Sequence, residues 1–452
     1  PVISRAISYI YAKKLDGFTV TSGRINVPND EFFKEDPLNI LKLFNLSSEQ
    51  GLFIHPNAIK VLRQSIGLVN KALREDKEAN NLFLKILLSE KNAESTLRAM
   101  NETGVLGRFI LDFGKIVGLM QFNMYHHFTA DEHLLRAIGE LNKLFYSIRS
   151  NVPELIRDLI GQGLNKKILT IALFFHDIAK GRDEDHSEVG ALIVNRFSKR
   201  FSLTDYEVET ISWLVREHLV MSDFSQTRDI MDQKTIKDFS SIVQTPERLK
   251  LLLILTIADI TAVGPDVWSA YKGQLLEQLY KETYTYLAGD ILGNDREARV
   301  KGRIEKLFSE TTIDKDNLFK QWIKNHSDQY WLGLNNEIIL RHTLMYVNDF
   351  RKKPIIAIHN EEGMDTTEVS IMSKDSPGLF AKLTAAFSSM DINIVNAKIF
   401  TNKKGIAVDV IWIQDINNQP IKEKMRLDRI KDNIVSFVDG KKIIEDIPIS
   451  GF

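Results

Sequence analysis

Cysteine is absent from this chain of 452 residues, and this absence excludes disulfides, thiolate nucleophiles and cysteine-ligated zinc. Any metal site must therefore use histidine and carboxylate side chains. An excess of charge of either sign is also lacking, because 59 Lys and Arg residues stand against 60 Asp and Glu residues. This balance gives no global electrostatic reason to expect nucleic acid or a membrane surface as a partner.

Long hydrophobic runs are missing as well. The longest apolar stretch, from Leu249 to Ala262, is interrupted by Lys250 and Asp259 and falls short of the ~20 residues that a membrane span needs. We interpret it as a buried helix and expect no membrane partner.

The chain begins with Pro1 rather than Met and has no basic segment followed by an apolar run. We therefore expect that it has no signal peptide, that it is cytoplasmic and that it is a fragment of a longer protein.

The hydrophobic pattern divides the chain into four regions. Residues 1–107 show helical periodicity, residues 108–295 form an all-helical domain, and residues 296–364 are a charged helical linker. In residues 365–452 the period changes from 3.6 to 2 in a β-α-β-β-α-β order, with a last strand expected near Ile443. The predicted fold class is therefore mainly α, with a C-terminal ferredoxin-like α+β domain.

Residues 1–107 lack the motif of a nucleotidyltransferase. That motif is a Gly-Ser pair followed at a distance by Asp-x-Asp, which together hold nucleotide phosphates and two divalent metals. We find no such arrangement in this region and interpret it as a helical scaffold.

Histidine and aspartate residues are concentrated in the helical domain. Thr129 and Glu132 predict a capping box at the start of a helix that carries His133 in its first turn. His176 and Asp177 follow the apolar run Ile168 to Phe175. Further residues of these types are His186, His218 and Asp259.

Asp259 is the most informative of these residues, because its neighbours are apolar and an unpaired buried carboxylate is strongly penalised. A divalent cation would compensate its charge, and so would a hydrogen bond or an ion pair to Lys or Arg. The combination with histidines on other helices favours the cation. We predict a metal site formed by His133, His176, Asp177 and Asp259, with Mn²⁺ or Mg²⁺ as the expected ion and Fe²⁺ or Zn²⁺ as alternatives.

Three further residues are candidates for catalysis. We expect Lys180 to contact a substrate phosphate. His186 and His218 are candidates to bind a second metal, to orient water or to donate a proton. A purely structural role as polar residues near helix ends stays open for both histidines.

The order His133, His176-Asp177, Asp259 resembles the signature of the HD superfamily of metal-dependent phosphohydrolases. Longer strings resemble the bacterial bifunctional uridylyltransferase/uridylyl-removing enzymes, which modify the signalling protein PII. These strings are Gly107-Arg108-Phe109, Met120 to His126, Thr129 to His133, Phe175 to Gly181, Asp185 to Glu188 and Ala258 to Ile260.

The resemblance implies a function for each domain. In that family a nucleotidyltransferase adds UMP to a tyrosine of PII, the HD domain removes it, and two C-terminal ACT domains sense glutamine. Only one complete ACT-like unit is present here, and the transferase motif is missing. The resemblance therefore implies a uridylyl-removing phosphodiesterase regulated by glutamine, without the transferase activity of the parent enzyme.

The segment Asp375-Ser376-Pro377-Gly378-Leu379 opens the first helix of the ACT-like unit. Backbone N–H groups at such a helix start can bind a carboxylate, and Asn393 and Asn396 would add polar contacts. We predict an effector site at Asp375, Gly378, Leu379, Asn393 and Asn396, with an ordinary cap and turn as the alternative. Edge strands of such units commonly pair, so a dimer through the ACT domain is compatible with the sequence.

Two other functions stay open at this point. A guanosine tetraphosphate hydrolase also combines HD and ACT domains, although only about 80 residues separate the two domains here. A non-catalytic module that senses an amino acid and regulates a partner is the other alternative.

Overall fold

The computed structural model describes residues 15–120, 128–146, 153–264, 267–288, 294–309, 317–349, 354–360 and 364–442. The chain is mostly helical, as expected, and divides into two compact units. Unit 1 comprises residues 1–228, 238–268 and 276–284, and unit 2 comprises residues 229–237, 269–275 and 285–452. The string from Gln121 to His126, the first residues of the chain and the strand expected near Ile443 lie outside the described residues.

The first part of unit 1 contains a short hairpin that the helical interpretation of residues 1–107 missed. Strand β1 (Thr19–Thr21) pairs with β2 (Arg24–Asn26). Ser22 and Gly23 between them both have positive φ, which suits a tight two-residue turn, and β-branched residues favour the extended strand. At three residues each, these strands are too short for a clear alternating pattern.

Helices make up the rest of this part of unit 1, and aromatic rings join them to the following domain. Phe83 contacts Phe174 edge to face, and Phe113 stacks on Phe174. The helices are α2 (Phe32–Glu35), α3 (Asn39–Gln50), α4 (Pro56–Gln64), α5 (Lys71–Glu75), α6 (Lys77–Leu87), α7 (Ala93–Glu102), α8 (Val105–Phe109) and α9 (Leu111–Gly114), with a 3₁₀ turn at Ile66–Leu68.

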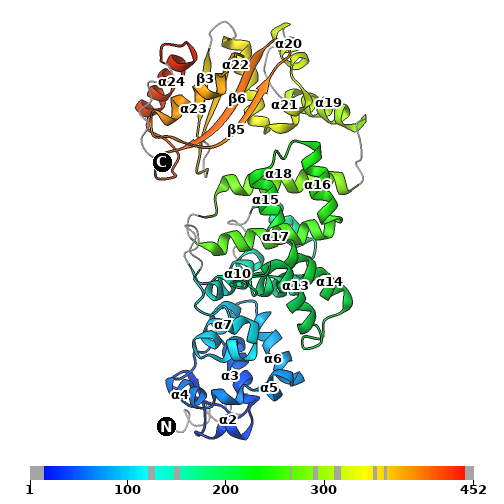
Figure 1. The fold of residues 1–452 in the computed structure, drawn as a ribbon, viewed down its shortest axis with the longest axis vertical. Helices are drawn as coiled ribbons and strands as arrows, with labels where there is room; N and C mark the ends of the chain where they lie inside the picture. The colour runs from blue at the N-terminus through cyan, green and yellow to red at the C-terminus, as the bar shows by residue number, and fades with distance from the viewer. Residues whose placement is uncertain are drawn as a thin grey trace. The chain divides into compact units, whose positions relative to one another are not determined.

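Among the helices that follow, α17 contacts α14 and α15 as well as α10 and α12. Helix α17 begins at Pro246 after the cap Thr245 and ends before Gly264, as the sequence predicts. It packs against α12 and against α10, which lies beside it in Figure 1. The Thr204–Glu207 capping box at α14 is also confirmed. These helices are α10 (Ala130–Tyr146), α11 (Glu154–Gly161), α12 (Lys166–Phe175), α13 (His186–Phe197), α14 (Asp205–Arg216), α15 (Val220–Thr227), α16 (Gln233–Val243), α17 (Pro246–Val263) and α18 (Ala270–Leu287).

Unit 2 contains a four-stranded antiparallel sheet in the order β3-β4-β6-β5. Strand β3 (Ile355–His359) lies in the region that the sequence analysis assigned to a helical linker. Its apolar, mostly β-branched residues after Pro354 suit an edge strand, but five residues are too few to distinguish a strand from a helix end by periodicity. The remaining elements are α19 (Asn294–Ser309), α20 (Asn317–Asn325), α21 (Asp328–Gly333), α22 (Asn336–Asp349), β4 (Thr367–Lys374), α23 (Leu379–Ser388), β5 (Asn393–Thr401), β6 (Ile406–Gln414) and α24 (Lys424–Val438).

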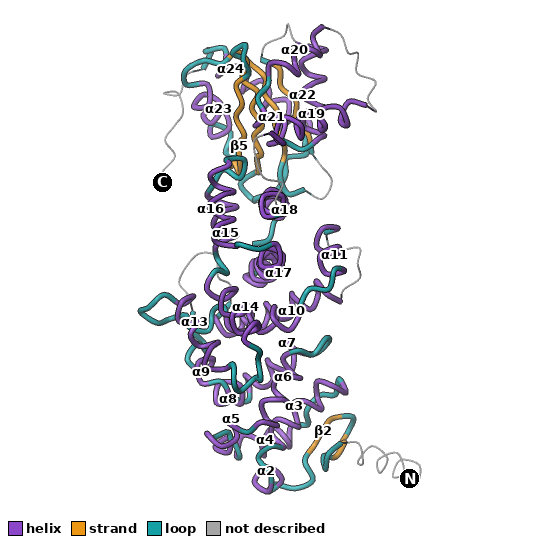
Figure 2. Tube along the Cα trace, turned by 90° about the vertical axis from the view of Figure 1, so that its right-hand side faces the viewer, coloured by secondary structure: helices purple, strands orange, loops and turns teal. Residues whose placement is uncertain are grey.

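Helices cover both faces of this sheet (Figure 2). One face packs Met372, Val408 and Val410 against α19 to α22. The other face packs Ile371 and Ile411 against α23 and α24. Burial on both faces explains why β6 is apolar at nearly every position rather than alternating strictly. Strand β4 is buried along almost its whole length as well, although it also carries polar residues. Among the described residues, no helix is long and apolar enough to cross a membrane.

Candidate metal centre

The histidine and aspartate residues singled out in the sequence come together in unit 1. His133 lies in the first turn of α10, His176 caps the end of α12, and Asp177 follows it. His186 is the first residue of α13, His218 lies just after α14, and Asp259 lies in the second half of α17. Five segments therefore converge on one point, although the two outermost residues are 126 positions apart.

His133, His176 and Asp259 form the first group of donor atoms. Nε2 of His133 lies 2.9 Å from Oδ1 of Asp259, and Nε2 of His176 lies 3.2 Å from the same oxygen. The two imidazole nitrogens are 3.3 Å apart. Asp259 thus faces the two histidines, as a shared cation would require.

Asp177 lies between this group and a second one formed with His186 and His218. Its Oδ2 lies 3.4 Å from Nε2 of His176, while its Oδ1 lies 3.5 Å from Nε2 of His186 and 3.7 Å from Nε2 of His218. The donor atoms within each group lie within 4.8 Å of one another. One carboxylate therefore presents one oxygen to each of two possible cation positions.

Backbone hydrogen bonds orient two of the imidazoles. Nδ1 of His176 lies 2.8 Å from the carbonyl oxygen of Leu173, and Nδ1 of His218 lies 2.8 Å from that of Val215. Because a carbonyl oxygen only accepts, each Nδ1 carries the proton and donates it. Such bonds fix the ring and direct Nε2 toward a metal, as is usual for ligating histidines.

Most of the centre is buried, with Asp259 and His186 partly exposed, and its charges shift the pKa values of its members. Burial opposes the charged form of His176, but the carboxylates of Asp177 and Asp259 outweigh it and raise the pKa of His176 to about 10. Burial likewise acts to raise the pKa of both carboxyl groups, yet His176 keeps them well below their usual range. Burial lowers the pKa of His218 to about 4. This ring is therefore neutral, and its Nε2 can offer a lone pair to a cation.

The residues present suit a divalent cation. Asp177 Oδ1 and His186 Nε2 are buried atoms that have no hydrogen-bond partner within the described part of the chain. Buried polar atoms are normally satisfied, so these two point to a ligand between them. A set of imidazole and carboxylate donors fits Mn²⁺, Fe²⁺, Mg²⁺ or Zn²⁺ and does not choose among them.

Lys180 belongs to the same cluster. Its Nζ lies 2.6 Å from Oδ2 of Asp177, one turn earlier in the chain, and its side chain is 13% exposed. Gly181 next to it has φ +78°, and a side chain there would meet Leu119 at 2.7 Å, so the glycine lets the loop pack closely. The ammonium group of Lys180 is thus held at the centre.

The predicted effector residues do not lie in one place. Asp375 follows the end of β4 beside Gly405, and its Oδ2 accepts a hydrogen bond from Thr401 Oγ1. Asn393 pairs with Gln414 and Asn396 with Trp412, at the opposite end of β5. At ~3.3 Å per strand residue, about 26 Å separates the two ends of β5, so Asp375 and Asn393 of one chain cannot contact one small ligand.

Gly378 and Leu379 remain with Asp375 at the start of α23. Gly378 is the N-cap residue with φ +80°, and Leu379 is buried in the core that the sheet forms with α23 and α24.

Sequence reasoning missed Asp409 on β6, which is 1% exposed and lies in register with Ile371. Burial, followed by the charge of Asp375, raises the pKa of Asp409 to about 7. A charged residue in an otherwise apolar strand was the available signal.

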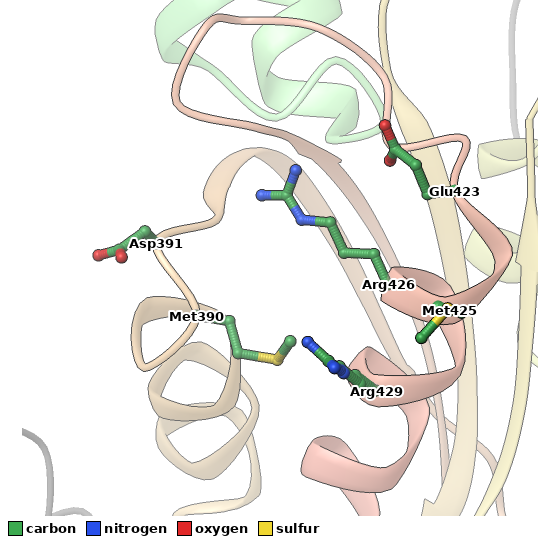
Figure 3. Close-up of a pocket in the computed structure, with 6 residues that line it drawn as sticks. All are labelled: Met390, Asp391, Glu423, Met425, Arg426 and Arg429. Atoms are coloured by element: carbon green, nitrogen blue, oxygen red, sulfur yellow. The ribbon is translucent and has the colours of Figure 1, made fainter.

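A shallow hollow of about 480 Å³ lies elsewhere on unit 2. Figure 3 shows Arg426 and Arg429 extending from α24 toward Met390 at the end of α23. Asp391 and Glu423 also line the hollow, and the carboxylate of Asp391 points away from both arginines in Figure 3. We assign no ligand to it.

Two protein-family models match parts of the chain. A model described as HD domain matches residues 124–264, which contain all six donor residues. This region of the chain is therefore similar to HD domains. A second model, described as the uridylyltransferase GlnD third domain, matches residues 18–109.

The chain is also similar to a whole protein of this kind. It is 39% identical over 458 aligned positions to the bifunctional uridylyltransferase/uridylyl-removing enzyme of Nitrobacter winogradskyi (strain ATCC 25391 / DSM 10237 / CIP 104748 / NCIMB 11846 / Nb-255). The expected resemblance to these enzymes is thereby confirmed over 99% of the chain. The chain spans about half of the relative's length, 49%.

Likeness to solved structures is weak. Two structures of a CCA-adding enzyme, in complex with ATP and with CTP, align with TM-scores of 0.36 and 0.35 at 15% and 14% identity. The alignments cover 73% and 72% of this chain and 64% and 63% of the other chains. We base no argument on them.

Proposed function

We propose that this chain is a metal-dependent phosphodiesterase that removes the uridylyl group from a tyrosine of the PII signalling protein. The observation that carries the proposal is the convergence of His133, His176, Asp177 and Asp259 in a buried HD-domain centre. The similarity to a uridylyl-removing enzyme over nearly the whole chain supports the substrate.

The donor groups suggest how the centre works. His133, His176 and Asp259 would hold one divalent cation, His186 and His218 would hold a second, and Asp177 would bridge the two positions. Divalent cations at such a centre supply a hydroxide at neutral pH and polarise the phosphoryl oxygens. Mn²⁺ or Mg²⁺ is the expected ion.

The side chains of the centre have complementary roles. Lys180 extends its ammonium group to the centre and would bind a nonbridging phosphate oxygen, since it already lies against the carboxylate of Asp177. The leaving group of a uridylyl-tyrosine diester is a phenolate with a pKa of about 10, so it needs less protonation than an alkoxide does. The burial of the centre limits access of bulk water during the reaction.

Release of UMP from uridylylated PII tests the proposal. We expect the unaltered chain with Mn²⁺ to release UMP and the His176→Ala variant to lose at least about 100-fold in rate, as loss of a metal ligand would cause. Lys167→Met is a matched control, because the Lys167–Glu207 ion pair stabilises the opposite end of α12. Equal rates for His176→Ala and the unaltered chain would reject the assigned centre.

Hydrolysis assays with other substrates distinguish the two alternative functions, a guanosine tetraphosphate hydrolase and a non-catalytic regulatory module. Hydrolysis of guanosine tetraphosphate, with uridylylated PII left intact, would favour the stringent-response type of hydrolase. A chain that binds Mn²⁺ but hydrolyses neither substrate nor a nitrophenyl ester of thymidine monophosphate would favour a regulatory module without catalysis.

We further propose that the C-terminal sheet of unit 2 is an ACT-type domain that binds glutamine at Asp375, Gly378 and Leu379. The N-terminus of α23 supplies N–H groups for the ligand carboxylate, and the carboxylates of Asp375 and Asp409 suit its ammonium group. Asn393 and Asn396 lie too far along β5 to join this site, so their contribution requires a second copy of the domain.

A dimer through β5 would bring in such a copy. Strand β5 is one of the two edge strands of the sheet and exposes Val395 and Ile399. Calorimetric titration with glutamine, with glutamate as the control ligand, tests binding, and light scattering tests dimer formation. We expect Asp375→Ala to weaken glutamine binding at least tenfold; unchanged binding would contradict this site.

A further inference from the structure

Helix α7, outside the HD-domain match, contacts the first turn of the helix that bears His133. Helix α7 spans residues 93–102 and lies within the stretch matching the third domain of the uridylyltransferases, whereas the HD match begins at residue 124. The contacts involve Asp131 and Glu132, the two residues immediately before His133.

Glu132 is bound by an arginine of α7. Both carboxylate oxygens of Glu132 accept hydrogen bonds from Arg98, one from Nε at 3.3 Å and one from Nη2. The same Nη2 donates to Glu94 Oε1 at 3.1 Å, so Glu94 holds the guanidinium in place. The sequence predicts that Glu132 belongs to a capping box, whereas in the structure its carboxylate is bound by Arg98.

Asp131 is bound from two sides. Its Oδ2 accepts a hydrogen bond from Asn101 Nδ2 of α7 at 2.7 Å, and its Oδ1 accepts one from the backbone N–H of Gly118 at 3.0 Å. The residue is 6% exposed, so these bonds are shielded from water. Gly139, further along α10, leaves room for Glu94, because a side chain there would meet the Glu94 carboxylate at 1.9 Å.

A helix's first turn lacks part of its backbone hydrogen bonds and opens more easily than the middle. His133 lies in that turn and must keep Nε2 within ligand distance of the position that it shares with His176 and Asp259. A shift of about 1 Å in a reacting or ligating group can cost about 100-fold in rate. Contacts that fix this turn therefore affect the metal centre directly.

We propose that Arg98 and Asn101 of α7 are positioning residues for the metal ligand His133, so that the region matching the uridylyltransferase third domain completes the hydrolase centre. The inference rests on the proposed function. Neither residue touches the centre, and each acts through the residue that it binds at the start of α10.

Mn²⁺ binding to the full chain tests this inference without relying on turnover. We expect Arg98→Met and Asn101→Ala each to weaken Mn²⁺ binding about tenfold or more, in line with the loss of groups that orient metal ligands. Arg98→Lys should recover part of the affinity, because a lysine keeps one charged contact to Glu132. Lys167→Met removes a comparable ion pair from the far end of α12 and should leave the affinity unchanged.

Thermal melts separate positioning from general destabilisation. The inference predicts that Arg98→Met and Lys167→Met lower the melting temperature by similar amounts while only the first loses Mn²⁺ affinity. Affinity in Arg98→Met and Asn101→Ala equal to that of the unaltered chain would overturn the inference and leave the proposed function intact. An unaltered chain that binds no Mn²⁺ would instead overturn the proposed function together with the inference. If Arg98→Met does not fold, Asn101→Ala still decides between these outcomes.

Discussion

Oδ1 of Asp259 lies 2.9 Å from Nε2 of His133, although 126 residues separate them in the chain. Two packed helices, α10 and α17, bring them together. The carboxylate would be costly in the apolar middle of α17 without a partner, and the imidazoles beside it supply one. The proximity of Asp259 and His133 underlies the predictions that follow.

Removal of His186 should halve the number of bound metal ions. His186 Nε2 faces Asp177 Oδ1 and belongs to the second group of donors, so His186→Ala leaves the first group intact. We expect the Mn²⁺ content to fall from two ions to one per chain, measured by elemental analysis after equilibrium dialysis. His133→Ala affects the first group and serves as the counterpart. Two ions retained in His186→Ala would contradict the two-position centre.

Metal binding should stabilise unit 1. A ligand that binds only the folded state adds about 2.7 kcal/mol at a concentration 100 times its dissociation constant. We expect Mn²⁺ to raise the melting temperature of the unaltered chain and to raise that of Asp259→Ala by less, because Asp259 belongs to only one of the two groups of donors. Scanning calorimetry with and without a chelator is the measurement. An equal shift in both proteins would show that the metal binds elsewhere.

Lys180→Met should weaken the binding of an anionic substrate. The side chain of methionine occupies similar space but removes the ammonium group 2.6 Å from Asp177 Oδ2. We expect KM to rise about tenfold and Lys180→Arg to recover part of the loss, because an arginine restores the charge. Steady-state kinetics with uridylylated PII provide the check, and an unchanged KM would argue against contact with the phosphate.

The stability of unit 2 should depend on pH through Asp409. Burial, and then the charge of Asp375, raises the pKa of the Asp409 carboxyl to about 7 from an ordinary value of 3.8. An acid with a raised folded-state pKa contributes stability that is fully present below its unfolded pKa and is lost as pH rises through its folded pKa. The loss therefore occurs between about pH 4 and pH 7, at a slope of up to about 1.4 kcal/mol per pH unit.

Asp409→Asn should remove this loss, because an amide does not ionise. The measurement is the urea midpoint for protection of the β6 amides from hydrogen exchange, compared between the two proteins at each pH. The urea midpoint of Asp409→Asn should rise relative to that of the unaltered chain as pH increases from about 4 to about 7. A constant difference between the two proteins would mean that Asp409 does not titrate in this range.

Gly114→Ala should destabilise unit 1. A Cβ atom at Gly114 would lie 2.6 Å from the backbone oxygen of Gly107, and backbone atoms cannot move aside as a flexible side chain can. We expect a loss of about 1–3 kcal/mol, as for other overpacked sites. Gly161→Ala is the matched control, because nothing lies within 4 Å of that position and alanine favours the helix. A chemical denaturation series would measure both variants.

The sequence by itself determined the helical character of most of the chain, the limits of α17 and the residue types of the centre. Local signals suffice for these features: Thr245 and Pro246 begin the helix, Gly264 follows its end, and an Asp within an apolar run demands a partner. Neither β3 nor the β1–β2 hairpin was predicted, since each strand is too short to show a period.

Only the tertiary structure decided at what distances the predicted residues meet and which other side chains they contact. It placed Asp177 between two groups of histidines, directed Glu132 to Arg98 rather than to a cap, and separated Asp375 from Asn393 along the sheet. These relationships depend on helix packing and strand register, which join residues far apart in the chain. Spacing along the sequence carries no information on such distances, because they arise only once the apolar faces have packed together.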